Sequence, residues 1–185
     1  PGLVYTHGGG MTILTTDNRV HRRWCTDLAA AGSVVVMVDF RNAWTAEGHH
    51  PFPSGVEDCL SGVVVQGESG GGNLAIATTL LAKRRGRLDA IDGVYASIPY
   101  ISGGYAWDHE RRLTELPSLP PFVVAVNELD PLRDEGIAFA RRLARAGVDV
   151  AARVNIGLVH GADVIFRHWL PAALESTVRD VAGFA

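Results

Sequence analysis

The sequence predicts an α/β fold in which a mostly parallel, doubly wound sheet carries helices on both faces. Segments of strand and helix character alternate along the chain, as they do in repeated strand–helix–strand units. The strand candidates are continuous apolar runs without a polar face, which is typical of buried parallel strands. One of them leads through the glycine-rich turn 67–71 directly into a helical run. With 185 residues, the chain is long enough for one domain with a substantial core.

The N-terminal part of the chain supplies two strands and one helix. Residues 2–6 predict a short strand that runs into a loop of one histidine and three glycines at 7–10. Residues 18–31 predict a helix that stops at Gly32, since their apolar side chains repeat at helical spacing. These side chains are Val20, Trp24, Leu28 and Ala31. Residues 33–40 predict the next strand, and because it is apolar throughout we expect it to have no exposed face and to belong to a central parallel sheet.

Two abrupt joins interrupt this alternation. Residues 41–53 predict an irregular loop and residues 54–60 the first turns of a helix, but the next strand already begins at Val63. A right-handed crossover between parallel strands needs about a dozen residues or more, usually a full helix. The polar and aromatic stretch 103–118 passes equally abruptly into a strand after Leu119. We therefore expect residues to be absent at the joins 60/61 and 119/120.

The rest of the chain continues the alternation. The helix after the glycine-rich turn covers 73–82, and the basic run 83–87 predicts its cationic C-terminus with a glycine stop. Further strands are predicted at 93–99, 122–126 and 148–156, and further helices at 131–146 and 166–184. This order of elements is that of an open parallel sheet.

Composition and charge exclude several function classes. The chain is 47% hydrophobic and 20% charged, and its net charge of -3 argues against a general nucleic-acid partner. No apolar run reaches membrane-spanning length and no signal peptide is visible, so we expect no membrane span and a cytoplasmic location. Cys25 and Cys59 form neither a disulfide framework nor a metal-ligand pattern, and we expect both to be buried thiols.

The turn Gly-Glu-Ser-Gly-Gly at 67–71 has the context of a nucleophile elbow, with a strand before it and a helix after it. Ser69 at its apex must adopt a strained backbone conformation. Side chains two residues to either side would collide, so glycine suits positions 67 and 71. Ser69 also lies at a helix N-terminus, where free N–H groups favour a developing negative charge.

Further polar side chains follow other predicted strands. They are His7, Asp130 and His160, each beside glycine or at the point where a strand ends. Because the carboxyl ends of parallel strands meet at one edge of an open α/β sheet, we expect these loops to lie beside Ser69. The chain order is serine, acid, histidine, which differs from the orders in two common classes of serine protease.

These residue types suit acyl transfer. A serine hydroxyl is a weak nucleophile at neutral pH, so Ser69 needs a base within hydrogen-bond reach, and His160 is the candidate. Asp130 would hold the imidazole tautomer and stabilise the imidazolium. The backbone N–H groups expected to stabilise a developing oxyanion are those of Gly8, Gly9, Gly10 and Gly70, chiefly the last three. We expect no metal or organic cofactor.

Other residues compete for these roles. Glu128, Asp134 and Asp163 are alternatives for the acid, but Asp134 falls in the first turn of a helix, where acids are common for dipole reasons alone. Asp130 leaves its strand directly, and we prefer it. Glu68 adjoins Ser69, but its side chain should point the other way, which favours a buried ion-pair or loop role.

The remaining histidines and aromatics are weaker candidates. His7 is expected to fix its loop by hydrogen bonding rather than to act as the base. Tyr105 and Trp107 could either line an acyl pocket or pack their own loop. The histidines without a strand-end glycine context are expected at the surface or in packing: His21, His49, His50, His109 and His168.

The motifs that carry this chemistry are His7–Gly10, Asp39–Arg41, His50–Pro53, Glu57–Cys59, Gly67–Ala75, Asp130–Gly136 and His160–Gly161. Together they resemble those of the hormone-sensitive-lipase-like carboxylesterases, and the likeness spans nearly the whole chain. The resemblance implies an α/β-hydrolase fold. It also implies that Ser69, Asp130 and His160 form the catalytic triad, and that the glycine loop and Gly70 form the oxyanion hole.

The chain departs from this family in two ways. Glu68 and Gly70 stand where the family usually has aspartate and alanine, and both preserve the elbow. The family also has a helical cap, of which the N-terminal part is missing before Pro1 and the other part is too short at 103–119. We therefore expect residues 1–185 to be a single α/β-hydrolase core domain that lacks most of the cap.

The resemblance implies a serine carboxylesterase that hydrolyses small carboxylic esters or lactones, a macrocyclic lactone among them, through an acyl-enzyme. Opening a lactone is the same acyl transfer to serine and then to water. Two alternatives stay open. One is a non-catalytic hydrolase-fold protein that binds a ligand, against which the retained serine, acid and histidine argue. The other is an amidase that uses the same residues.

Overall fold

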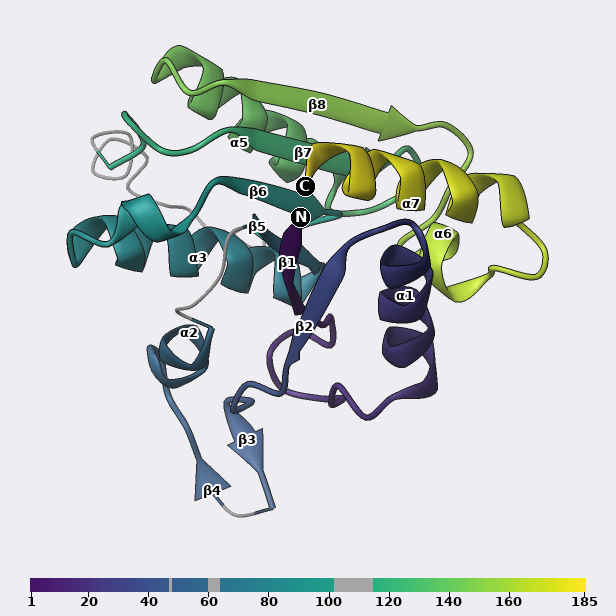
Figure 1. Ribbon diagram of the computed structural model, residues 1–185, viewed down its shortest axis with the longest axis horizontal. Coiled ribbons are helices and arrows are strands. Elements are labelled where there is room, and N and C mark those ends of the chain that lie inside the picture. The colour runs from purple at the N-terminus through teal and green to yellow at the C-terminus, as the bar shows by residue number, and fades with distance from the viewer. Residues whose placement is uncertain (47, 60–63, 102–114) are drawn as a thin grey trace.

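The centre of the molecule is a six-stranded parallel sheet in the order β2-β1-β5-β6-β7-β8 (Figure 1). The computed structural model describes residues 1–46, 48–59, 64–101 and 115–185. The strands of this sheet are β1 (Gly2–Thr6), β2 (Val34–Val38), β5 (Val64–Glu68), β6 (Gly93–Ser97), β7 (Phe122–Asn127) and β8 (Val150–Asn155). Since neighbouring strands are parallel, the loops after them collect at one edge of the sheet.

Helices cover both faces of this sheet (Figure 1). They are α1 (Arg19–Ala30), α2 (Ser54–Asp58), α3 (Gly70–Arg84), the 3₁₀ turn η1 (Leu88–Ala90), α5 (Arg133–Arg145), α6 (Ala162–Ile165) and α7 (Pro171–Phe184). Helices α1 and α7 share one hydrophobic cluster with Tyr95 of β6. Helices α3 and α5 share another cluster with Val94 and Ala96, the neighbours of Tyr95 on the same strand. Successive residues of β6 thus point to opposite faces, and the predicted doubly wound α/β fold is confirmed.

The helix ends follow local chemistry, and some differ from the prediction. Helix α1 begins after Asn18, whose side chain accepts a hydrogen bond from the Val20 N–H at 2.8 Å. Helix α3 begins at Gly70, earlier than expected, because the glycines of the turn are already helical. The closing helix was expected from residue 166, but α7 begins at Pro171, since proline fits the first helical turn.

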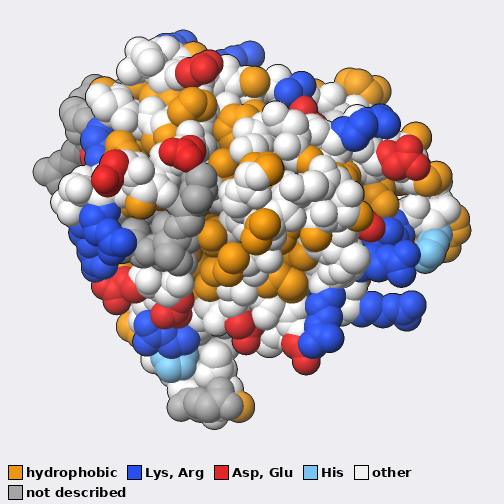
Figure 2. All heavy atoms as spheres, in the orientation of Figure 1, with side chains coloured by type: hydrophobic (Ala, Val, Ile, Leu, Met, Phe, Trp, Pro, Cys, Tyr) orange, Lys and Arg blue, Asp and Glu red, His pale blue; other side chains and the backbone are white. Residues whose placement is uncertain are grey.

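Strand β2 belongs to the central parallel sheet, as predicted, but the expectation that it has no exposed face is wrong. It is an edge strand of the sheet, and Val34 and Val36 are 70% and 54% exposed. Figure 2, in the same orientation as Figure 1, shows hydrophobic side chains gathered on the viewed face of the molecule, in the region where Figure 1 draws β1 and β2. Val35 and Met37 point to the opposite face of the sheet and pack against the hydrophobic cluster that α1 and α7 share, called the α1 cluster below. A run of valines predicts a strand, but its burial depends on neighbours that the run itself does not contain.

The loop predicted at 41–53 contains a short antiparallel hairpin, β3 (Trp44–Thr45) and β4 (Gly48–His49). The rings of Trp44 and His49 stack across it with their centroids 4.3 Å apart. The predicted join at 60/61, the start of a strand at Val63 and nearly all of the stretch 103–118 lie outside the described residues. In the described part of the chain, no helix has both the length and the apolar character to cross a membrane.

Candidate active site

Ser69 lies between β5 and α3 in a backbone conformation that side chains rarely adopt. Its φ of 55° and ψ of -117° lie outside the regions favoured by L-residues. Hydrogen bonds on both sides hold this conformation, because the Ser69 N–H donates to the Ser97 carbonyl and the Ser69 carbonyl accepts from the Tyr100 N–H, both at 3.0 Å. The strained strand–turn–helix conformation expected of a nucleophile elbow is present.

Glycine is required on both sides of Ser69, as predicted. A Cβ atom at Gly67 would lie 2.3 Å from the carbonyl oxygen of Gly71, and one at Gly71 would lie 2.0 Å from the carbonyl oxygen of Thr6. These are backbone atoms that no side-chain movement can clear. The turn therefore packs directly on the end of β1, which brings Ser69 beside the loop that follows that strand.

Ser69, His160 and Asp130 form one hydrogen-bonded chain. The Oγ of Ser69 lies 3.0 Å from Nε2 of His160, and Nδ1 of His160 lies 2.7 Å from Oδ2 of Asp130. Because a carboxylate only accepts, Nδ1 carries the proton, which leaves Nε2 as the acceptor for the serine hydroxyl. In this arrangement a histidine can take a proton from a hydroxyl while the carboxylate holds the ring in the required tautomer.

Asp130 is held firmly and the competing acids are engaged elsewhere. Asp130 is 5% exposed, and its other oxygen accepts the Leu132 N–H at 2.8 Å. Asp134 forms an exposed ion pair with Arg133, which lowers the pKa of its carboxyl. The other two candidates also have partners outside the hydrogen-bonded chain: Glu128 accepts from the Gly157 N–H, and Asp163 accepts from Thr177.

The glycine loop after β1 lies against the N-terminus of α3. Gly9 and Gly10 have φ values of 104° and 61°, which only glycine adopts without strain. A Cβ atom on Gly70 would lie 2.8 Å from the backbone nitrogen of Gly10, so the two segments are in close contact. Among the described residues, no hydrogen-bond acceptor contacts the N–H of Gly9 or Gly10.

Gly8 differs from the expectation that its N–H could face an oxyanion. This N–H donates to Oε1 of Glu68 at 2.7 Å, so it is already engaged. The Gly8 carbonyl accepts from Nδ1 of His7 at 2.6 Å. His7 therefore holds the loop by hydrogen bonding, which is the role expected of it.

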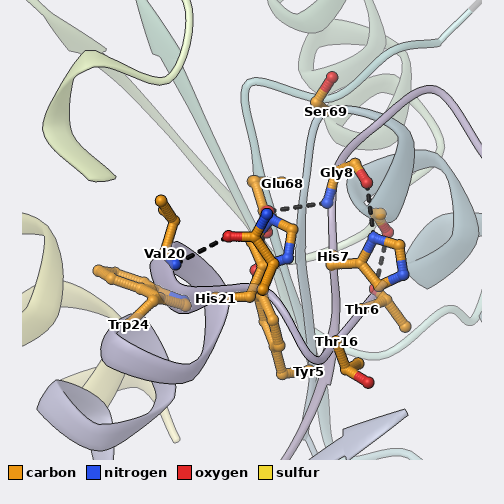
Figure 3. A network of polar contacts seen from close by, with 12 residues as sticks. Tyr5, Thr6, His7, Gly8, Thr16, Val20, His21, Trp24, Glu68 and Ser69 are labelled. Carbon is orange, nitrogen blue, oxygen red and sulfur yellow. Dashed lines mark hydrogen bonds and ion pairs between the residues drawn. The ribbon is translucent and has the colours of Figure 1, made fainter. Parts of the chain in front are cut away.

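Glu68 lies in a buried polar cluster on the other side of the turn from Ser69 (Figure 3). Its Oε1 accepts from the Tyr5 hydroxyl at 2.8 Å as well as from Gly8, and Nε2 of His21 lies 3.5 Å away. Burial raises the pKa of the Glu68 carboxyl from 4.5 to about 7, against the opposing effect of the hydrogen bonds from Gly8 and Tyr5. The buried loop role expected for Glu68 agrees with these contacts.

The buried partners of Glu68 were not singled out in the sequence. His21 was expected at the surface or in packing; it is 5% exposed, and its ring stacks on His7 with the centroids 5.2 Å apart. For Tyr5 the sequence predicts only a place in the first strand. Tyr5 lies two positions before His7, and residues two apart along an extended chain point to the same face, which is the signal that could have placed both side chains together. Tyr105, Trp107 and His109 lie outside the described residues.

No group of three or more histidine, cysteine, aspartate or glutamate side chains that could hold a metal ion occurs in the described ranges. Cys25 and Cys59 are buried free thiols, as expected.

Comparison with known proteins agrees with this geometry. A family model for the alpha/beta hydrolase fold matches residues 3–115 and 99–164. The chain belongs to the alpha/beta hydrolase fold family. Among relatives in this family, carboxylesterase NlhH of Mycobacterium tuberculosis is 30% identical over 98% of this chain and 72% of its own length. Esterase LipI of the same species is 29% identical over 97% of this chain and 70% of its own length.

Solved structures of alpha/beta hydrolases refine the comparison. Brefeldin A esterase, a bacterial homologue of human hormone-sensitive lipase, is 74% identical with a TM-score of 0.92, over 100% of this chain and 68% of that one. Esterase Est22 is 32% identical with a TM-score of 0.90, over 100% of this chain and 71% of that one. The predicted likeness to hormone-sensitive-lipase-like carboxylesterases is confirmed, and within that family the chain is similar to brefeldin A esterase. The chain is a carboxylic ester hydrolase.

Proposed function

We propose that the chain hydrolyses carboxylic esters and lactones through a covalent acyl-enzyme on Ser69, with His160 as base and Asp130 as the orienting acid. The observation that carries this proposal is the unbroken chain of hydrogen bonds from Ser69 Oγ through both ring nitrogens of His160 to Asp130. Ser69 also stands at the N-terminus of α3, where unpaired N–H groups favour negative charge.

The reaction follows from these contacts. Ser69 Oγ attacks the ester carbonyl carbon while its proton passes to Nε2 of His160, which gives a tetrahedral intermediate with a negative oxygen. Collapse of the intermediate breaks the bond to the alcohol oxygen, and the imidazolium returns its proton to the leaving alcohol. Water then repeats the sequence on the acyl-enzyme, with His160 as base again, and releases the carboxylic acid and Ser69.

The N–H groups of Gly9, Gly10 and Gly70 are the proposed oxyanion donors. Those of Gly9 and Gly10 have no acceptor in the described chain, and Gly70 is in contact with Gly10 at the N-terminus of α3. One such donor typically lowers the barrier by about 3 kcal/mol. Gly8 is left out of this set because its N–H is bound to Glu68.

Lactones fit the same machinery, and the likeness to brefeldin A esterase makes a macrocyclic lactone of that type the proposed substrate class. In a lactone the leaving alcohol stays on the acyl chain, so acylation gives an enzyme ester that carries its own hydroxyl. Deacylation by water yields a hydroxy acid. The cytoplasmic location expected from the sequence stays a prediction.

Turnover of a short-chain p-nitrophenyl ester by the wild-type protein and by Ser69→Ala tests the esterase proposal. We expect Ser69→Ala to lose about 10⁵-fold or more in kcat, because acylation needs the hydroxyl. Ser176→Ala, on the exposed side of α7, is the matched control and should keep wild-type turnover. Equal turnover by wild type and Ser69→Ala would overturn the proposal.

Two further substrates separate the alternatives. Incubation with brefeldin A, followed by mass spectrometry, should yield the product heavier by one water molecule, and an unchanged lactone would reduce the proposal to simple esters. The matching p-nitroanilide tests amide hydrolysis, which the esterase proposal expects to be much slower than ester hydrolysis. Ligand binding without turnover of any of these substrates would favour the non-catalytic alternative.

We also propose that residues 1–185 form one hydrolase core that lacks internal segments at 60/61 and 119/120. The alignment with carboxylesterase NlhH extends over 240 residues, although this chain has only 185. NlhH therefore carries residues inside the matched span that this chain does not. Insertion of the NlhH residues at these joins should raise the thermal midpoint, and an unchanged or lower midpoint would count against the proposal.

A further inference from the structure

The carboxyl of Glu68 joins the nucleophile elbow to the glycine loop. Glu68 is the residue before Ser69, and its side chain leaves the turn in the opposite direction from the serine hydroxyl (Figure 3). Its Oε1 accepts the Gly8 N–H at 2.7 Å. A single side chain thus ties the residue beside the proposed nucleophile to the first glycine of the loop that holds the proposed oxyanion donors.

The two polar groups of Gly8 are both held. Its N–H donates to Glu68, and its carbonyl accepts from Nδ1 of His7 at 2.6 Å. The peptide unit between Gly8 and Gly9 is planar and trans, so the Gly8 carbonyl and the Gly9 N–H point in opposite directions. The hydrogen bond from His7 to the Gly8 carbonyl therefore sets the direction of the Gly9 N–H, and the bond from the Gly8 N–H to Glu68 fixes the preceding peptide unit, from which the loop starts.

We propose that Glu68 is a positioning residue of the oxyanion hole, which holds the N–H groups of Gly9 and Gly10 in place against Ser69 by accepting the hydrogen bond from Gly8. Glu68 acts through the loop and does not touch the substrate. This inference rests on the proposed function, since it needs an oxyanion formed at Ser69.

The cost of burying Glu68 supports this role. Glu68 is 8% exposed, its Oε2 has no hydrogen-bond partner among the described residues, and burial raises the pKa of its carboxyl to about 7. An apolar side chain of this size would be cheaper to bury at the same place. What an apolar side chain could not supply is the oxygen that accepts from Gly8 and from the Tyr5 hydroxyl.

Within the part of the chain that the structure describes, the charged and titratable neighbours of Glu68 offer no permanent cation. Nδ1 of His21 lies 3.1 Å from the Thr15 carbonyl and donates to it, so neutral His21 turns a lone pair toward Glu68. Burial lowers the pKa of His21, which disfavours the imidazolium that would pair with the carboxylate. The remaining neighbours are neutral or acidic: Tyr5 and Cys25 from one side, and Asp163 from α6.

The substitutions Glu68→Gln and Glu68→Met separate the acceptor oxygen from the volume of the side chain. Glutamine keeps an oxygen that can accept from Gly8 and Tyr5, whereas methionine fills the space without one. We expect Glu68→Gln to keep kcat for a p-nitrophenyl ester within about threefold of wild type. Glu68→Met should lose about 10- to 100-fold in kcat with little change in KM, because misplaced donors weaken the transition state and not the bound ester.

A trifluoromethyl ketone provides a second readout, since its adduct with Ser69 carries the oxyanion. Its affinity should fall in Glu68→Met by the same factor as kcat/KM and stay near wild type in Glu68→Gln. Asp180→Leu is the matched control, because it removes an acceptor of a tyrosine hydroxyl elsewhere in the molecule, at Tyr95. This control should change thermal stability and leave kcat alone.

The outcomes distinguish this inference from the proposed function. Turnover that does not depend on Ser69 would overturn both. Ser69-dependent turnover with equal kcat in Glu68→Gln and Glu68→Met would overturn the positioning role alone. If Glu68→Met does not fold, Glu68→Asp replaces it. The aspartate side chain is shorter by one methylene, so its carboxylate lies farther from the Gly8 N–H. We therefore expect Glu68→Asp to lower kcat more than Glu68→Gln does, and a wild-type kcat in Glu68→Asp would contradict the positioning role.

Discussion

At the scale of single residues, Ser69 combines two properties that helix-cap serines do not usually share. Its φ is positive, at 55°, and its side chain makes no capping hydrogen bond to the helix it precedes. Such a backbone conformation costs about 1–3 kcal/mol and persists only where the surroundings impose it. The hydroxyl is instead within hydrogen-bond distance of Nε2 of His160, as the proposed nucleophile requires.

Asp130 and Asp134 offer a direct test of which acid orients His160. Asp130→Asn should lower kcat by about 10³- to 10⁴-fold at neutral pH, because the amide no longer favours the required tautomer. Asp134 forms an ion pair with Arg133 at the surface, so Asp134→Asn should leave kcat within about twofold of wild type. Steady-state kinetics with one p-nitrophenyl ester decides between them, and a larger loss in Asp134→Asn would contradict the assignment.

Glu68 predicts a pH dependence of stability with a definite sign. Between pH 4.5 and about 7 the folded chain holds a proton on Glu68 that the unfolded chain has released. The free energy of unfolding contributed by Glu68 is therefore largest below pH 4.5 and falls as the pH rises through 7. Relative to Glu68→Gln, wild type should lose up to about 3 kcal/mol across this window.

Urea unfolding of wild type and Glu68→Gln at several pH values measures this difference. The shared contributions of His7 and His21 largely cancel in the comparison. Glu175→Gln, at an exposed carboxylate on α7, is the matched control for replacing a glutamate by glutamine. The prediction is wrong if the free energy of unfolding of wild type minus that of Glu68→Gln stays constant or grows as the pH rises.

At the scale of secondary-structure elements, the close packing of the elbow on β1 explains why glycine is needed at its ends. The Cβ of an alanine at Gly71 would lie 2.0 Å from the Thr6 carbonyl oxygen, so Gly71→Ala should cost at least about 3 kcal/mol or prevent folding. Gly183→Ala, in helix α7 with open space around it, should instead stabilise by up to about 1 kcal/mol. Urea midpoints of the two variants test this, and similar midpoints would refute the packing argument.

The elements also show where local sequence patterns suffice. The succession of β5, the turn with Gly67 and Gly71, and α3 could be predicted, because the residues that determine this turn all lie within positions 67–71. The start of α7 at Pro171 was missed because the apolar spacing continues through residues 166–170, and only the fit of proline at a helix start decides the boundary. The hairpin of β3 and β4 was missed because each strand has only two residues.

At the scale of the whole molecule, the parallel sheet brings together residues that are far apart in the chain. Ser69 and His160 are separated by 91 positions and Asp130 and His160 by 30, yet each pair is in hydrogen-bond contact. This convergence could be predicted because parallel strands all end at one edge. The position of a strand inside the sheet or at its edge could not be predicted, because strand pairing depends on the full set of strands. Strand β2 is the example.

The exposed face of β2 gives a test at this scale. Val34 is 70% exposed and Val35 packs against the α1 cluster, although both belong to the same apolar run. Val34→Lys should change the free energy of unfolding by no more than about 0.5 kcal/mol, whereas Val35→Lys should lower it by about 2 kcal/mol or more. Chemical denaturation of both variants checks this, and equal losses would mean that β2 is covered on both faces.

The central claim, that Ser69 is the nucleophile served by His160 and Asp130, is tested most directly by covalent labelling. Diethyl p-nitrophenyl phosphate should release one equivalent of p-nitrophenolate per protein chain, and peptide mass spectrometry should find the phosphoryl group on Ser69. Asp130→Asn should be labelled at the same residue but far more slowly, and Ser69→Ala should not be labelled there or elsewhere at a comparable rate. Labelling of another residue, or equal labelling rates in wild type and Ser69→Ala, would contradict the claim.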